Sequence, residues 1–266
     1  MNKFKLIFIS GIGTLFESYD FYLFTIFAVP LNKAFFEEIN QDKTLWIFLI
    51  FSIGYLARVI GAFLFGYWGD RIGRQYAFRL TIIIMALSSI SIGLIPLYNT
   101  IGILAIIFLI LLRFTQGISY GGEYSGATIL IVEQYKKHQP ILIMFLSIMI
   151  ISGIFLAKIV YSLIEYFYSH DAVINYGWRI AYIFGGLLIL HSYFIRKKIN
   201  ESIDFALIKK NNRLKNSVID VLKNHKVLLL LAILSLSSTQ SYWGVFMVYQ
   251  KKRKAPRFIY GDISVL

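Results

Sequence analysis

GYWGDRIGR, at residues 66–74, is a short run of glycines and charged side chains between two long apolar segments. The apolar segments cover residues 45–68 and 76–96, and each is long enough to cross a hydrocarbon core as a helix. Glycines permit a tight turn, and charged side chains are stable at helix ends that face water. The run therefore predicts a helical hairpin with its turn in a loop at a membrane surface.

The whole chain has the composition of a membrane protein. Its 266 residues are 58% hydrophobic and only 15% charged, and the mean hydropathy is +0.67. A water-soluble domain of this size needs more charge to cover its surface. We therefore predict an all-α membrane protein with seven membrane-spanning helices. The corresponding apolar segments cover residues 6–30, 45–68, 76–96, 101–131, 140–161, 178–195 and 227–249.

The distribution of charge divides the chain into four parts. We predict an N-terminal six-helix transmembrane domain at residues 1–195 and a basic cytoplasmic linker at residues 196–226. A seventh transmembrane helix at residues 227–249 and a basic tail at residues 250–266 follow. The tail carries its lysines and arginines on what would be the outer side of the seventh helix, against the usual distribution of positive charge. Its true side is therefore left open.

Basic residues gather in alternate connections between the apolar segments. The connection after the second segment, the connection after the fourth and the linker are rich in them, and the remaining connections are poor. Because basic loops stay in the cytoplasm, we expect a multi-pass protein of the bacterial inner membrane with a cytoplasmic N-terminus. These loops also account for the net charge of +13, so we predict no nucleic-acid partner.

Five ionisable residues lie inside predicted spans, where a charge is costly unless it has a partner or a wet cavity. They are Glu17 and Asp20 in the first span, Arg58 in the second, and Arg113 and Glu123 in the fourth. Opposite charges on neighbouring helices could simply neutralise one another. The alternative is a proton or substrate pathway between the helices, and we favour this alternative because it is the usual role of such groups.

The fourth span also contains two interleaved G-x-x-x-G spacings. Gly117 pairs with Gly121, and Gly122 pairs with Gly126. Small residues at this spacing let two helix backbones approach closely within a membrane. We therefore predict a tight helix–helix contact along this span.

The sequence does not indicate an enzyme. It has no cysteine and no H-E-x-x-H pattern. His138, His170 and His225 lie in predicted loops at spacings that suggest no metal site. We predict neither a metal nor a cofactor.

The run at residues 66–74 resembles the signature loop between the second and third helices of the major facilitator superfamily. In that family the loop pairs with the cytoplasmic end of the fourth helix and helps to hold the outward-facing state. The resemblance implies the same conformational role for a set of residues in this chain. They are Gly66, Gly69, Asp70, Arg71, Gly73 and Arg74, with Glu133 as the acidic partner on the fourth helix.

Two further motifs resemble the metabolite–proton symporter branch, which includes proline/betaine, α-ketoglutarate and citrate transporters. FESYDF, at residues 16–21, is similar to its first-helix motif; RFTQG at 113–117 and GGE at 121–123 are similar to its fourth helix. The resemblance implies proton-coupled symport of a small metabolite, such as proline/betaine or an organic acid, by alternating access. It also implies that the five ionisable residues above line the pathway, a carboxylate carrying the proton and an arginine orienting an anionic group of the solute.

Members of that superfamily have twelve helices in two halves, with the solute between them. This chain would supply one half, the linker and one helix of the second half, so we expect a chain truncated after about seven helices. It could be completed by a second half or a second copy, or it could be a non-transporting remnant or assembly partner. An uptake assay separates these alternatives.

Overall fold

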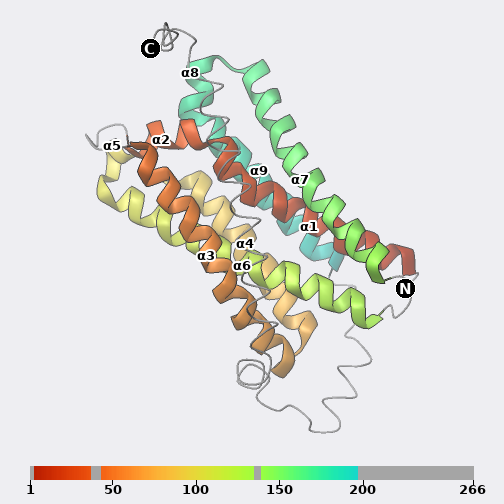
Figure 1. The fold of residues 1–266 in the computed structure, drawn as a ribbon. Helices are drawn as coiled ribbons and strands as arrows, with labels where there is room; N and C mark the ends of the chain where they lie inside the picture. Colours follow the sequence, from red (N-terminus) through yellow and green to blue (C-terminus); the bar gives the residue numbers. More distant parts are fainter. Residues whose placement is uncertain (1–2, 37–42, 135–138, 197–266) are drawn as a thin grey trace, which may run out of the picture. The chain divides into compact units, whose positions relative to one another are not determined.

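The computed structural model describes residues 3–36, 43–134 and 139–196, and the regular structure in these ranges is helical throughout. This confirms the predicted all-α fold (Figure 1). The long helices are α1 (Lys3–Ile26), α3 (Lys43–Arg71), α4 (Arg74–Leu94), α6 (Ile103–Gln134), α7 (Gln139–Phe167) and α9 (Trp178–Arg196). The short elements are α2 (Ala28–Phe36), α5 (Tyr98–Ile101), α8 (His170–Ala172) and the single-turn π-helix η1 (Val173–Gly177).

The described residues contain five helices that are long and apolar enough to cross a membrane. Helices α1 and α2 together make a sixth candidate, bent by 59° at a break next to Phe27. Each of these candidates coincides with one of the first six predicted spans. The predicted seventh span at residues 227–249 lies outside the described residues, as do almost all of the linker and the whole tail.

Helix α1 lies at the centre of the described helices. Its residues 17–24 are all buried, which means that no face of the helix reaches the surface over these two turns. It packs against α7 and α9, while α6 packs against both α3 and α4 (Figure 1). Polar side chains on this part of α1 therefore have to find partners on neighbouring helices, because no water reaches them from outside.

The closest helix–helix contact joins α3 and α6, and the predicted G-x-x-x-G spacing forms it. A Cβ atom added to Gly117 would lie 2.2 Å from the carbonyl oxygen of Gly54, and one added to Gly121 would lie 2.0 Å from that of Arg58. At these two positions only the hydrogen atom of a glycine fits between the helices, and a methyl group does not. The second spacing behaves differently, because Gly122 and Gly126 approach the aromatic rings of Phe65 and Phe78 rather than a backbone.

The hairpin turn between α3 and α4 is shorter than the sequence predicted. Helix α3 continues to Arg71 and α4 begins at Arg74, so only Ile72 and Gly73 connect them. The prediction that residues 66–74 form a loop is therefore wrong for residues 66–71 and for Arg74, which are helical. Among the glycines of the run, Gly73 alone has a φ angle, 138°, that residues with a side chain rarely adopt. The other glycines of the run are in helical conformation without strain.

Candidate functional site

The carboxylate of Asp20 lies at the centre of the described helices, with an exposed fraction of 0%. Gln116 on α6 donates a hydrogen bond from Nε2 to Oδ2 at 2.7 Å. Ser89 on α4 lies within hydrogen-bonding distance of Oδ1 through its hydroxyl group. The same hydroxyl lies 2.9 Å from the carbonyl oxygen of Tyr182 on α9. Three helices around α1 thus supply the surroundings of this one carboxylate.

Arg113 on α6 is also fully buried, and it reaches Asp20 through an intermediate side chain. It donates from Nη1 to Oε1 of Gln116 at 3.1 Å and from Nη2 to the carbonyl oxygen of Phe21 at 3.0 Å. Gln116 therefore accepts from the arginine with one end of its amide and donates to the carboxylate with the other. Asp20 and Arg113 are thus linked through the amide of Gln116 rather than by a direct ion pair.

Arg58 on α3 reaches the same cluster through aromatic rings. Its guanidinium carbon lies 3.7 Å from the ring centre of Phe21, 4.1 Å from that of Tyr55 and 4.2 Å from that of Tyr120. The guanidinium carbon of Arg113 lies 4.0 Å from the ring centre of the same Phe21. Both arginines thus contact one phenyl ring by cation–π interactions.

The two remaining ionisable residues, Glu17 and Glu123, are buried as well. Glu17 is 1% exposed and lies on α1 about one turn before Asp20. Glu123 is 1% exposed and lies 3.4 Å from the hydroxyl of Thr81 on α4, which donates to it. Ten residues of α6 separate Glu123 from Arg113, which corresponds to about 15 Å along the helix axis. The structure thus brings together Asp20, Arg58 and Arg113.

Sequence reasoning missed the uncharged residues that make the cluster. Gln116 could have been found, because it lies three residues after Arg113 and so on the same helix face. Ser89 and the rings of Tyr55 and Tyr120 carry no such signal, since they come from apolar segments with no distinguishing pattern.

The residues of the signature run lie at the adjoining ends of α3 and α4. Arg74 lies 3.6 Å from Asp70 in an ion pair between positions four apart. Arg71 lies over the ring of Tyr67, at 4.4 Å. Glu133 belongs to the last turn of α6, but its side chain lies outside the described part of the chain. Its pairing with the run stays a prediction.

One pattern on α6 resembles an enzyme motif. The stretch GISYG at residues 117–121 fits G-x-S-x-G, which in hydrolases marks a serine on a sharp turn between a strand and a helix. Here the stretch lies within a continuous helix, and the hydroxyl of Ser119 donates to the carbonyl oxygen of Thr81. It serves helix packing, since the strained turn that exposes a nucleophile is not present in it. The described residues also hold no group of three side chains suited to a metal ion.

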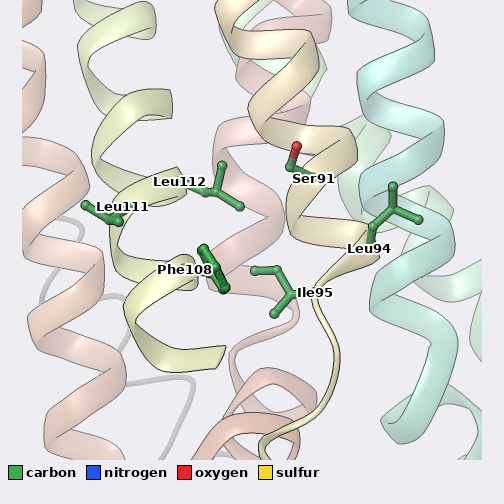
Figure 2. A pocket seen from close by; sticks show the side chains of 6 residues that line it. All are labelled: Ser91, Leu94, Ile95, Phe108, Leu111 and Leu112. Atoms are coloured by element: carbon green, nitrogen blue, oxygen red, sulfur yellow. The ribbon is translucent and has the colours of Figure 1, made fainter. Parts of the chain in front are cut away.

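A hollow of about 460 Å³ lies elsewhere, between α4 and the start of α6 (Figure 2). A single hydroxyl group interrupts its otherwise apolar lining. The lining residues are Ser91, Leu94, Ile95, Phe108, Leu111 and Leu112. Since none of these side chains is charged, the hollow offers nothing to orient an ionic solute, and the polar cluster is the better candidate site.

The fold matches that of a solved transporter. The proton:xylose symporter XylE of E. coli, a protein of the major facilitator superfamily, superposes with a TM-score of 0.71 over 90% of this chain and 53% of its own. The sequences are 17% identical, so the likeness concerns the fold. The chain therefore shares the all-α, multi-pass membrane fold of that transporter.

The family follows from the sequence. The model of the "Sugar (and other) transporter" family matches residues 6–234, and the chain belongs to this family. It is 36% identical over 201 residues to a Staphylococcus haemolyticus protein named "Putative proline/betaine transporter", a match that covers 74% of this chain and 43% of that protein. It is 31% identical over 249 residues to the inner membrane metabolite transport protein YhjE of Escherichia coli, covering 92% and 57%. The chain spans about half the length of the curated relatives it matches. These relatives are transporters rather than enzymes, as the sequence predicted.

Proposed function

We propose that this protein takes part in proton-coupled symport of a small metabolite, such as proline, betaine or an organic acid, by alternating access. Asp20 carries the coupled proton, and an arginine of the cluster orients the anionic group of the solute. The polar pathway is lined by Glu17, Asp20, Arg58, Arg113 and Glu123. The names of the relatives support the solute class, and the family supports transport.

One observation carries the role of Asp20: its partners can satisfy both of its protonation states. When the carboxylate is charged, Ser89 can donate to Oδ1 while Gln116 donates to Oδ2. When it is neutral, the carboxyl proton can be donated to the hydroxyl oxygen of Ser89, which then donates to the carbonyl oxygen of Tyr182. A proton can therefore bind to Asp20 and leave it while the Ser89 hydroxyl keeps a hydrogen-bond partner in both states. In a direct ion pair, protonation of the carboxylate would leave a buried arginine without its partner.

The membrane setting completes the proposal. We infer that the chain lies in the inner membrane with its N-terminus in the cytoplasm, as the basic connections indicate. In this fold the solute lies between two six-helix halves. A second half, supplied by the same or another chain, is therefore part of the proposed pathway. The ends of α3, α4 and α6, with Gly66, Gly69, Asp70, Arg71, Gly73, Arg74 and Glu133, hold one state of the cycle.

The test is solute uptake into proteoliposomes that contain the full chain. A pH gradient, acid outside, is imposed, and the accumulation of radiolabelled proline and glycine betaine is measured for the wild type, Asp20→Asn and Glu123→Gln. Asp171→Asn is the matched control, because Asp171 is exposed on α8. We expect accumulation by the wild type and the control, and loss of it in Asp20→Asn. Unchanged accumulation in both Asp20→Asn and Glu123→Gln would refute the assignment, and no accumulation by the wild type would favour a non-transporting assembly partner.

A further inference from the structure

The two arginines of the cluster differ in how their hydrogen-bond donors are used. Arg113 has acceptors for Nη1 and Nη2, which are Gln116 and the carbonyl oxygen of Phe21, and its Nε alone is buried without a hydrogen-bond partner among the described residues. Arg58 has two buried donor atoms, Nε and Nη2, with no hydrogen-bond partner among the described residues. Buried donors of a charged group are rarely left unpaired, because the loss is costly.

The unpaired donors of Arg58 are the two that lie on one edge of the guanidinium group. Nε–H and one N–H of Nη2 point in the same direction, so together they form a fork that fits both oxygens of a carboxylate. Carboxylate and phosphate oxygens match this fork, whereas a single hydroxyl or amino group cannot accept from both donors with good geometry. The edge is therefore suited to a carboxylate group and poorly suited to an alcohol or an amine.

Aromatic rings hold the guanidinium in place without using that edge. Phe21, Tyr55 and Tyr120 come from three different helices and lie within 4.2 Å of the guanidinium carbon, measured to their ring centres. Cation–π contacts fix a cation through electrostatic attraction to the ring face and consume no N–H donor. The side chain is thus positioned in advance, which lowers the entropic cost of binding an anion.

Local charge adds to the attraction for an anion. Arg58 and Arg113 both lie against Phe21, at 3.7 and 4.0 Å from its ring centre. Asp20 is linked to Arg113 through Gln116, and among the described residues no ion pair joins it to Arg58. Two guanidinium groups close together in a poorly solvated interior favour an anion beside them.

We propose that Arg58 is the receptor for the carboxylate of the solute that this protein binds and that Arg113 positions Gln116 and Phe21 without touching the solute. The solute class is then the small carboxylates, zwitterions included. This inference rests on the proposed function and makes it more specific, since it assigns the anion-binding role to one of the two arginines.

The test is equilibrium binding to the purified full chain in lipid nanodiscs, with two matched pairs of probes. Glycine betaine and choline share a trimethylammonium group, but only glycine betaine has a carboxylate. L-Proline and L-prolinol differ in the same way. We expect the wild type to bind at least one of the two carboxylates and to bind it about tenfold or more tightly than its alcohol. Equal binding within both pairs, or no binding of any probe, overturns the proposal.

Variants then assign the role to a residue. Arg58→Lys keeps the charge but removes the fork, and we expect carboxylate binding to fall about tenfold or more while alcohol binding is unchanged. Arg179→Lys is the control, because Arg179 also lies over an aromatic ring, that of Trp178 at 4.3 Å, but donates to the carbonyl oxygen of Gly93 outside the cluster. Unchanged carboxylate binding in Arg58→Lys would contradict the assignment.

Folding and function are checked separately. Each variant is compared with the wild type by its thermal unfolding midpoint, and Arg58→Gln replaces Arg58→Lys if the latter does not fold. The probe pairs on the wild type decide the solute class without any variant. Carboxylate-selective binding without accumulation in proteoliposomes would refute the proposed function and leave this inference standing. Accumulation that survives Arg58→Lys would refute this inference and leave the proposed function standing.

Discussion

The amide of Gln116 donates to the carboxylate of Asp20 at 2.7 Å, and this contact joins the fourth long helix of the chain, α6, to the central helix α1. The other end of the amide accepts from Arg113 at 3.1 Å. Because the amide is neutral, it links a buried acid to a buried base while leaving the acid outside a direct ion pair. The proton-carrying role proposed for Asp20 depends on this separation.

Replacing Gln116 by leucine is expected to lower the stability of the protein and its uptake activity. The change leaves Nη1 of Arg113 without its acceptor and removes one donor from Asp20, so we expect a loss of about 1–3 kcal/mol in the free energy of unfolding. The measurement is the thermal unfolding midpoint in detergent. Thr115→Val is the control, because the Thr115 hydroxyl bonds only the carbonyl oxygen of Leu111 in its own helix. Equal unfolding midpoints for the two variants would contradict the role of Gln116 as the link between Asp20 and Arg113.

Replacing Gly117 by alanine is expected to separate α3 from α6. The added Cβ would lie 2.2 Å from the carbonyl oxygen of Gly54, and backbone cannot move away as a side chain can. Overpacking of this kind costs about 1–3 kcal/mol, so the unfolding midpoint should fall. Gly66→Ala is the control within the helix, because no atom lies within 4 Å of its added Cβ. A midpoint of Gly117→Ala at or above that of Gly66→Ala would show that the contact is looser than described.

Replacing Gly73 by alanine is expected to strain the turn between α3 and α4. The φ angle of 138° is one that side-chain-bearing residues rarely adopt, and holding alanine there costs about 1–3 kcal/mol. Gly69→Ala serves as the control, because Gly69 is helical and its nearest neighbour would be 3.7 Å from the new Cβ. We expect a lower unfolding midpoint in Gly73→Ala than in Gly69→Ala. The reverse order would mean that the turn tolerates another conformation.

The first six spans could be predicted from the sequence because a bilayer requires continuous apolar runs of a fixed length. Buried charges were equally visible, since each is exceptional in such a run. The turn was predicted too long because composition does not distinguish a glycine inside a helix from one with a positive φ angle. Among the glycines at residues 66–74, only Gly73 has a positive φ angle.

The contacts of the cluster could not be predicted in the same way. Arg58 lies beside Phe21 and Tyr120 because of the way α3 is rotated against α6. That rotation depends on the crossing of the two helices at Gly54 and Gly117. That crossing is fixed by packing between distant segments, and no local pattern encodes it. Ser89 could not be singled out for the further reason that polar, uncharged residues are common in membrane helices for packing alone.

The most direct test of the central claim compares two modes of transport in Asp20→Asn proteoliposomes. Accumulation against a gradient requires net proton movement, whereas exchange of labelled for unlabelled glycine betaine at equal concentrations requires none. We predict that wild-type full chain performs both and that Asp20→Asn loses accumulation but retains exchange, because asparagine can still accept from Gln116 without binding a proton. Accumulation in Asp20→Asn equal to that of the wild type would contradict the claim that Asp20 carries the coupled proton.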